Sequence, residues 1–203
     1  MILVACALRA ELQYFEPPGG FAILAYGVGP VEAAVGTARE LAHRPYDAVI
    51  HAGIAGAYRT RARVGEARLV TNEALADFGL EEGGELVLPA GARLVERAAA
   101  DATLVARLEG TLPLATGLTV FTVTTTEATA TRLHDRYAHD VETMEGFAVL
   151  RAAAAAGVAA VGVRGISNYI GDRATSGWDF EAGARATAGA LEAVVARLAA
   201  VRA

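Results

Sequence analysis

Short apolar runs of strand length alternate along this chain with longer segments whose apolar residues recur every three or four positions. The first pattern is typical of buried β-strands, and the second is typical of helices with one apolar face. The sequence therefore predicts strands at residues 2–8, 21–26, 48–52, 67–74, 112–123 and 159–166, the fifth of them broken at Gly117. It predicts helices at residues 31–42, 89–108, 126–137, 146–156 and 180–201.

Strands that alternate with helices favour an α/β fold in which a mostly parallel central sheet is flanked by helices. The composition agrees, because 54% of the residues are hydrophobic and only 20% are charged, as suits strands buried on both faces. A length of 203 residues predicts one domain over residues 1–203. In such sheets ligands bind beyond the carboxyl ends of the strands, which here means residues 8–11, 27–30, 51–56 and 165–172.

Charge, cysteine content and hydropathy exclude several classes of partner. The net charge is −5, and all the basic residues are arginines spread along the chain, so there is no basic stripe for nucleic acid. Cys6 is the only cysteine, which rules out an intramolecular disulfide and favours a reducing compartment. The longest apolar run, residues 152–163, is shorter than the ~18 residues that span a bilayer. With no signal-peptide pattern at the N-terminus, we expect a cytoplasmic protein without a membrane partner.

Two segments rich in small residues follow predicted strands. Residues 27–29, Gly-Val-Gly, look like the start of a dinucleotide-binding fingerprint, but Glu32 stands in place of the third glycine. No acidic residue ends the next strand to bind a cofactor ribose, so we expect a tight turn beside a pocket. The second segment, residues 53–56, would let the backbone of Ala55 and Gly56 approach a flat ligand closely. Packing without a ligand is the alternative for this segment.

Charged side chains stand at three places suited to chemistry. Glu11 lies just beyond the first strand, although carboxylates at the start of a helix are often surface caps. Glu142 and Glu145 precede the Ala-rich helix, where the same alternative applies. Arg173 lies in a glycine-containing loop with Trp178, and a solvated loop is the alternative there.

The sequence predicts neither a metal site nor a cofactor. His51 lies on an apolar strand and is expected to be a hydrogen-bonded core histidine rather than a metal ligand. Four histidines and one cysteine show no spacing that would bind zinc.

Six short motifs together resemble the nucleoside phosphorylase and nucleosidase family, which includes 5′-methylthioadenosine/S-adenosylhomocysteine nucleosidase. Each motif is weak alone, but their order and spacing are specific. Within the family they are most similar to the futalosine hydrolases of the alternative menaquinone pathway. The motifs are residues 7–11, 27–29, 53–56, 64–66, 141–146 and 164–168.

The resemblance implies roles by position. Glu11 corresponds to the carboxylate that activates water, and Glu145 to the residue that binds the ribose hydroxyls, with Met144 packed under the sugar. Asn168 corresponds to the residue that faces the leaving purine. The resemblance also implies a purine nucleoside as the small-molecule partner and an assembly of at least a homodimer. Arg173 is a further candidate, for a carboxylate on the substrate.

Three departures from related patterns refine this expectation. Methylthioadenosine nucleosidase has Asp where this chain has Asn168, and a carboxamide can both accept from protonated N7 and donate to O6 of a 6-oxopurine. Ile54 replaces a serine, which leaves the geometry of the water open. His51 stands where a phosphorylase of the family has a phosphate-binding arginine. We therefore expect hydrolysis of futalosine to hypoxanthine and dehypoxanthine futalosine. Another purine nucleosidase and a non-catalytic nucleoside-binding protein are the alternatives.

Overall fold

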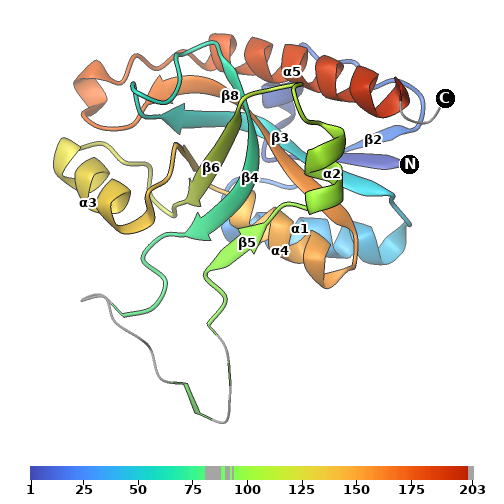
Figure 1. Cartoon of the computed structure of the whole chain (residues 1–203), viewed down its shortest axis with the longest axis horizontal. Coiled ribbons are helices and arrows are strands. Elements are labelled where there is room, and N and C mark those ends of the chain that lie inside the picture. The colour runs from blue at the N-terminus through green and yellow to red at the C-terminus, as the bar shows by residue number, and fades with distance from the viewer. Residues whose placement is uncertain (81–87, 90–91, 93, 201–203) are drawn as a thin grey trace.

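The computed structural model describes residues 1–80, 88–89, 92 and 94–200. Its strands are β1 (Ile2–Cys6), β2 (Phe21–Ala25), β3 (Ala48–Ala57), β4 (Ala67–Leu75), β5 (Arg97–Ala99), β6 (Leu114–Thr119), β7 (Val141–Thr143) and β8 (Ala159–Tyr169). Its helices are α1 (Pro30–His43), α2 (Ala102–Arg107), α3 (Glu127–Tyr137), α4 (Gly146–Ala155) and α5 (Phe180–Ala200), with 3₁₀ turns at Arg9–Leu12 and Arg173–Thr175. The α5 helix covers one face of the sheet, and α1 and α4 cover the other (Figure 1).

The described strands form one mixed sheet in the order β2-β1-β3-β7-β6-β4-β5, and β8 pairs with both β3 and β4. Pairs β1–β2, β1–β3, β3–β8, β4–β6 and β6–β7 are parallel, whereas β3–β7, β4–β5 and β4–β8 are antiparallel. The expected α/β fold with a mostly parallel sheet is therefore confirmed. Because β8 joins β3 to β4, strands β3, β7, β6, β4 and β8 form a closed circuit. Long-range pairing of this kind brings the ends of distant strands together around one space.

The central strands are buried on both faces, and β1 shows how the sequence achieves this. Side chains alternate between the two faces of a strand. Ile2, Val4 and Cys6 accordingly belong to the core beneath α5, while Leu3 and Ala5 belong to the core beneath α4. An unbroken apolar run is thus the correct pattern for a strand between two helical layers.

Strands β3 and β8 both extend further than the sequence predicts. The predicted strands end at residues 52 and 166, whereas β3 continues to Ala57 and β8 to Tyr169. In the structure Gly53 pairs with Arg164 and Gly56 with Asn168, with a register shift after Ala55. The backbone groups of these segments are satisfied by each other, so both segments remain strand. Three of the candidate residues, Ala55, Gly56 and Asn168, therefore lie inside strands rather than in loops.

The prediction of one helix over residues 89–108 is wrong for the described part of that segment. Ala99 pairs with Asn72 in an antiparallel ladder, which makes β5 a strand. Helix α2 begins only after Asp101, whose side chain accepts a hydrogen bond from the Leu104 amide at 2.8 Å. Residues 90–91 and 93 of the predicted helix lie outside the described residues. The expected break of the fifth strand at Gly117 is also wrong, since β6 runs through this residue.

None of the helices described is both long and apolar enough to cross a membrane. The expected cytoplasmic location stays a prediction.

The packing of α5 on the sheet generates a stability prediction. Gly165 of β8 lies so close to α5 that a Cβ atom there would overlap the Gly183 carbonyl oxygen, so Gly165→Ala should lower the free energy of unfolding by ~1–3 kcal/mol. Gly189 of α5 is exposed and has nothing within 4 Å of an added Cβ. Gly189→Ala should raise that free energy by ~0.5–1 kcal/mol, because glycine is a poor helix former. Urea unfolding of both variants tests the pair, and equal effects would contradict the close approach of α5.

Candidate functional site

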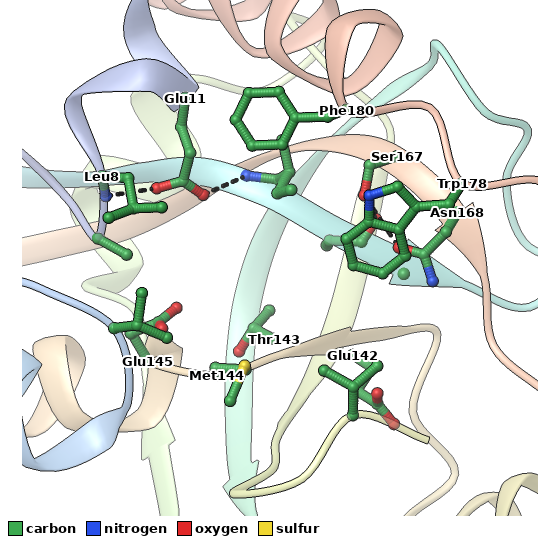
Figure 2. Close-up of a pocket in the computed structure, with 16 residues that line it drawn as sticks. Leu8, Glu11, Glu142, Thr143, Met144, Glu145, Ser167, Asn168, Trp178 and Phe180 are labelled. Atoms are coloured by element: carbon green, nitrogen blue, oxygen red, sulfur yellow. Dashed lines mark hydrogen bonds between the residues drawn. The ribbon is translucent and has the colours of Figure 1, made fainter. Parts of the chain in front are cut away.

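One cavity of ≈ 210 Å³ collects the segments that the sheet rule singles out. Leu8 and Glu11 follow β1, Val28 follows β2, and Ser167 and Asn168 belong to β8. Figure 2 shows Glu11 and Glu145 on one side of this space and Asn168 and Trp178 on the other. The remaining lining residues are Ala7, Ile54, Ala55, Gly56, Val123, Glu142, Thr143, Met144 and Phe180. The structure therefore places six of the seven candidate site residues in one cavity.

Glu11 is held in place through both carboxylate oxygens. The Leu8 amide donates to Oε2 at 2.9 Å, and the Ile54 amide donates to Oε1 at 3.1 Å (Figure 2). The side chain is only 5% exposed. A Cβ atom on Gly53 would lie 2.7 Å from Oε1 of Glu11 and 2.6 Å from Nη1 of Arg164. The small residue at position 53 thus makes room for these two side chains.

Arg164 is the buried cation of the site, and no local pattern in the sequence predicts a role for it. It is 1% exposed, and its Nη2 lies 2.6 and 2.7 Å from the two ring nitrogens of His51. Tyr26 Oη lies 2.6 Å from His51 Nε2. Burial and the adjacent Arg164 guanidinium hold the pKa of His51 well below its usual range, so the imidazole is neutral. His51 is therefore a hydrogen-bonded core histidine, as expected.

Glu145 links the start of α4 to the turn after β2. Its Oε1 accepts a hydrogen bond of 2.9 Å from the Gly29 amide, and the residue is 6% exposed. Gly29 has φ = 98°, a backbone conformation that favours glycine. Burial raises the pKa of Glu145, while the positive charge of Arg164 and the Gly29 hydrogen bond oppose this. The Gly-Val-Gly turn therefore donates a backbone hydrogen bond that positions a buried carboxylate.

Asn168 lies at the other side of the cavity. Its Oδ1 accepts a hydrogen bond of 2.9 Å from Ser167 Oγ, and its Nδ2 donates to the Tyr169 carbonyl at 3.2 Å. A Cβ atom on Gly56 would lie 2.9 Å from this Nδ2. Gly56 thus makes space for the carboxamide, and Ala55 lines the cavity beside it.

Arg173 does not line the cavity, unlike the other candidates. Its guanidinium stacks on the ring of Trp178, 4.7 Å from the centroid, and Trp178 forms part of the wall. The Asp179 amide donates to the Ser167 carbonyl at 2.7 Å, so this loop is joined to β8 beside Asn168. Arg173 therefore reaches the site through Trp178, which the sequence analysis noted only as its neighbour. No ion pair involving Arg173 occurs in the described part of the chain.

Two buried carboxylates complete the surroundings of the cavity. Glu142 of β7 lines it and accepts hydrogen bonds from the amide and hydroxyl of Thr124 at 2.9 and 2.5 Å. Burial raises the pKa of Glu142. Glu73 of β4 lies behind the wall and is 1% exposed. Its only signal in the sequence is that it is the one acidic residue of this strand, which also contains Arg68, Thr71 and Asn72.

Across the described residues, no group of three or more histidine, cysteine, aspartate or glutamate side chains could hold a metal ion. The cavity wall instead combines apolar side chains with three carboxylates and one carboxamide. Such a wall is suited to a ligand that develops positive charge next to the carboxylates.

The profile of the phosphorylase superfamily matches residues 19–200. The chain belongs to this superfamily. A futalosine hydrolase of Streptomyces coelicolor is 38% identical over 187 residues, which cover 84% of this chain and 76% of that protein. A futalosine hydrolase of Thermus thermophilus is 37% identical over 184 residues, which cover 87% of this chain and 82% of that protein. The resemblance drawn from the six motifs is thereby confirmed.

Solved structures share this fold. A futalosine hydrolase of Helicobacter pylori has a TM-score of 0.80 at 18% identity, with 96% of this chain and 97% of that chain covered. A 5′-methylthioadenosine/S-adenosylhomocysteine nucleosidase of Colwellia psychrerythraea, solved with adenine, has a TM-score of 0.82 at 19% identity, with 97% and 95% covered. At such identities the likeness establishes the fold alone.

The expected homo-oligomer stays a prediction, which sedimentation of a monomer would contradict. Val28, Val31 and Val35 are 52%, 63% and 61% exposed, and Val28 also lines the cavity. These valines place apolar surface beside the site.

Proposed function

We propose that this protein hydrolyses the N-glycosidic bond of futalosine to hypoxanthine and dehypoxanthine futalosine, without a cofactor, in menaquinone biosynthesis. The observation that carries the proposal is one cavity with two carboxylates, Glu11 and Glu145, at one side and the carboxamide of Asn168 at the other. Relatives named futalosine hydrolase, 37–38% identical over most of the chain, support the choice of substrate.

Glu11 is the proposed general base. Its two oxygens already accept backbone hydrogen bonds that fix its orientation, and a carboxylate retains further lone pairs that can accept a proton from water. The water oxygen bonds to C1′ as the bond from C1′ to N9 breaks, and the water proton passes to Glu11. The sugar passes through a transition state that resembles an oxocarbenium ion. Glu145 binds the ribose hydroxyls, and Met144 packs against the sugar.

Asn168 is the proposed partner of the leaving base. The electrons of the broken bond enter the purine ring, which takes a proton from solvent water at N7. The side-chain oxygen of Asn168 can accept from that N7–H, while its NH₂ group donates to O6. In the structure the carboxamide makes only local hydrogen bonds to Ser167 and Tyr169, so a rotation of the side chain releases both functions for a base.

The charges around the cavity favour water over phosphate as the nucleophile. Of the described residues that line the cavity, none is basic, whereas Glu11, Glu142 and Glu145 are acidic. A phosphate dianion would be repelled there. The neutral His51 is engaged by Arg164 and Tyr26, which leaves it no free donor for an anion. The geometry therefore supports hydrolysis rather than phosphorolysis.

Two other functions remain distinguishable by experiment: a nucleosidase for another purine nucleoside, such as methylthioadenosine, and a nucleoside-binding protein without activity. Incubation with futalosine, inosine and methylthioadenosine in phosphate-free buffer, followed by chromatography of the released base, separates them. Release of hypoxanthine from futalosine in preference to inosine supports the proposal. Preferential release of adenine, or no release at all, would contradict it.

Replacing the proposed base tests the mechanism. Glu11→Gln should lower kcat for futalosine by ~10²-fold to 10⁴-fold, because an amide cannot take the proton of the attacking water. The exposed Glu16 lies on the same segment, and Glu16→Gln should leave kcat unchanged. Steady-state rates and circular dichroism of both variants are the measurements. Near wild-type turnover of Glu11→Gln at saturating substrate would remove Glu11 from the mechanism.

Substrate choice is tested at the carboxamide. Asn168→Asp removes the donor to O6 and sets a carboxylate against that oxygen, so hypoxanthine release should fall steeply. Cleavage of the matched amino substrate, aminofutalosine, should rise relative to futalosine, since a carboxylate can accept from both N7–H and the amino group. The measurement is the ratio of kcat/KM for the two substrates in the wild type, in Asn168→Asp and in the control Asn72→Asp. An unchanged ratio in Asn168→Asp would show that this residue does not contact the purine edge.

Arg173 is proposed to pair with the carboxylate of the futalosine tail. Its guanidinium has no ion-pair partner among the described residues, and it stacks on a wall residue of the cavity. Arg173→Ala should therefore raise KM for futalosine, with little change for inosine, which lacks the carboxylate. Arg185, which stacks on Tyr14 at 4.0 Å, provides a matched control in Arg185→Ala. Equal effects of Arg173→Ala on both substrates would indicate a structural role only.

A further inference from the structure

Glu73 is a fully buried carboxylate that the proposed reaction does not use. It belongs to β4 and lies behind Thr143, which forms part of the cavity wall. Burial of an ionisable side chain without compensation is costly, so such a residue calls for a physical reason. Its hydrogen bonds supply one.

Two threonine hydroxyls bind Glu73. Thr119 Oγ1, at the end of β6, donates to Oε2 at 3.0 Å. Thr143 Oγ1, at the end of β7, donates to Oε1 at 3.2 Å. The two hydroxyl oxygens lie 3.2 Å apart, so one carboxylate orients both.

The same hydroxyl oxygens cap helix α4. The Phe147 amide donates to Thr119 Oγ1 at 2.8 Å, and the Gly146 amide donates to Thr143 Oγ1 at 3.3 Å. The first amides of a helix have no partner within the helix, and Glu145 at the N-cap makes no side-chain capping hydrogen bond. The cap of α4 is therefore supplied from β6 and β7. The negative charge of Glu73 behind it also suits the positive end of the helix dipole.

The surrounding backbone leaves space for Glu73. A Cβ atom on either Gly117 or Gly146 would overlap its carboxylate. Neither glycine has a positive φ, so the backbone conformation does not itself require glycine at either position. Two strands and the start of a helix thus converge on this one side chain.

We propose that Glu73 is a positioning residue: through Thr119 and Thr143 it fixes the first turn of α4 and thereby the carboxylate of Glu145. The role rests on the proposed function of Glu145 in binding ribose. Glu145 immediately precedes the two capped amides, and its Oε1 meets the Gly29 amide at 2.9 Å. A shift of the helix start would move this carboxylate relative to the sugar.

The electrostatic surroundings of Glu73 make its role measurable. The charged groups that act on it are Arg164 of β8 and Glu145 at the start of α4, whereas β6 and β7 present only hydroxyls. Burial raises the pKa of Glu73 to about 7, and Arg164 and the two threonine hydrogen bonds oppose this rise. A raised carboxyl pKa means that the folded state holds a proton that the unfolded state has already lost. The favourable contribution of Glu73 to the free energy of unfolding is therefore fully present at low pH. It is lost as the pH rises from about 4.5 to about 7.

Glu73→Gln separates positioning from stability. At pH 8 the variant should unfold at a temperature no lower than wild type, because it removes a buried charge and keeps the volume. Its kcat for futalosine should nevertheless fall by about 10-fold to 100-fold, since a displaced binding group raises the barrier. Val70→Ala provides the matched control on β4: Val70 is fully buried, so this change should lower the unfolding temperature but leave kcat unchanged. A Glu73→Gln variant with wild-type kcat would overturn the proposal.

A double-mutant cycle tests whether Glu73 acts through Glu145. In a Glu145→Gln background, Glu73→Gln should cause little further loss, because the group that it positions is already impaired. Full additivity of the two losses would show that Glu73 does not act through Glu145, and would overturn the proposal.

Amide exchange tests the cap without any substrate. Hydrogen exchange followed by NMR should be faster at Gly146 and Phe147 in Glu73→Gln than in wild type or Val70→Ala, while amides in the middle of α5 remain unchanged. If the wild type releases no base from any nucleoside, the proposed function fails, and the exchange measurement alone decides the structural part of this inference. Unchanged exchange at both amides would overturn it.

Discussion

The buried guanidinium of Arg164 is the charge on which the arrangement of the site depends. Buried carboxylates are costly unless opposite charge and hydrogen bonds compensate them. Burial raises the pKa of both Glu73 and Glu145, and the charge of Arg164 opposes this rise. The Nη1 atom of Arg164 faces the same Cβ position of Gly53 as the Glu11 carboxylate does. The neutral His51 orients this cation without cancelling its charge. One positive group at the centre of the sheet thus permits several carboxylates to surround a largely apolar cavity.

Glycines, which have no side chain, are as important to this site as the polar side chains that they accommodate. Gly53 leaves room for Glu11 and Arg164, Gly56 for Asn168, and Gly117 and Gly146 for Glu73. From the sequence, small residues after a strand suggest close approach of a ligand to the backbone. In the structure each of these four glycines admits a polar side chain from another segment of the chain, and Gly56 also lines the cavity. The glycines are visible in the sequence, but the side chains that they accommodate come from distant segments and are seen only in the structure.

Local patterns in the sequence predict most of the fold, because helices and doubly buried strands have distinct apolar periods. The predictions fail where long-range pairing decides. Strands β3 and β8 extend each other past Gly53, and β5 is a strand because it pairs with β4. The placement of Glu11 and Asn168 near one cavity follows from the rule that ligands bind at strand ends. Glu73 and Trp178 escape prediction, since nothing in their local sequence shows which side chains they meet.

The distribution of charge across the cavity matches the distribution of charge in the reaction. As the glycosidic bond breaks, the sugar becomes positive and the purine becomes negative. The carboxylates of Glu11 and Glu145 lie together on the side assigned to the sugar, while a carboxamide with both a donor and an acceptor lies on the side assigned to the base (Figure 2). The carboxylates of Glu11 and Glu145 are fixed by backbone hydrogen bonds before any ligand arrives, and the carboxamide of Asn168 needs only a rotation of its side chain. Such a site stabilises separated charge with little reorganisation, which is the main requirement for cleaving an N-glycosidic bond with water.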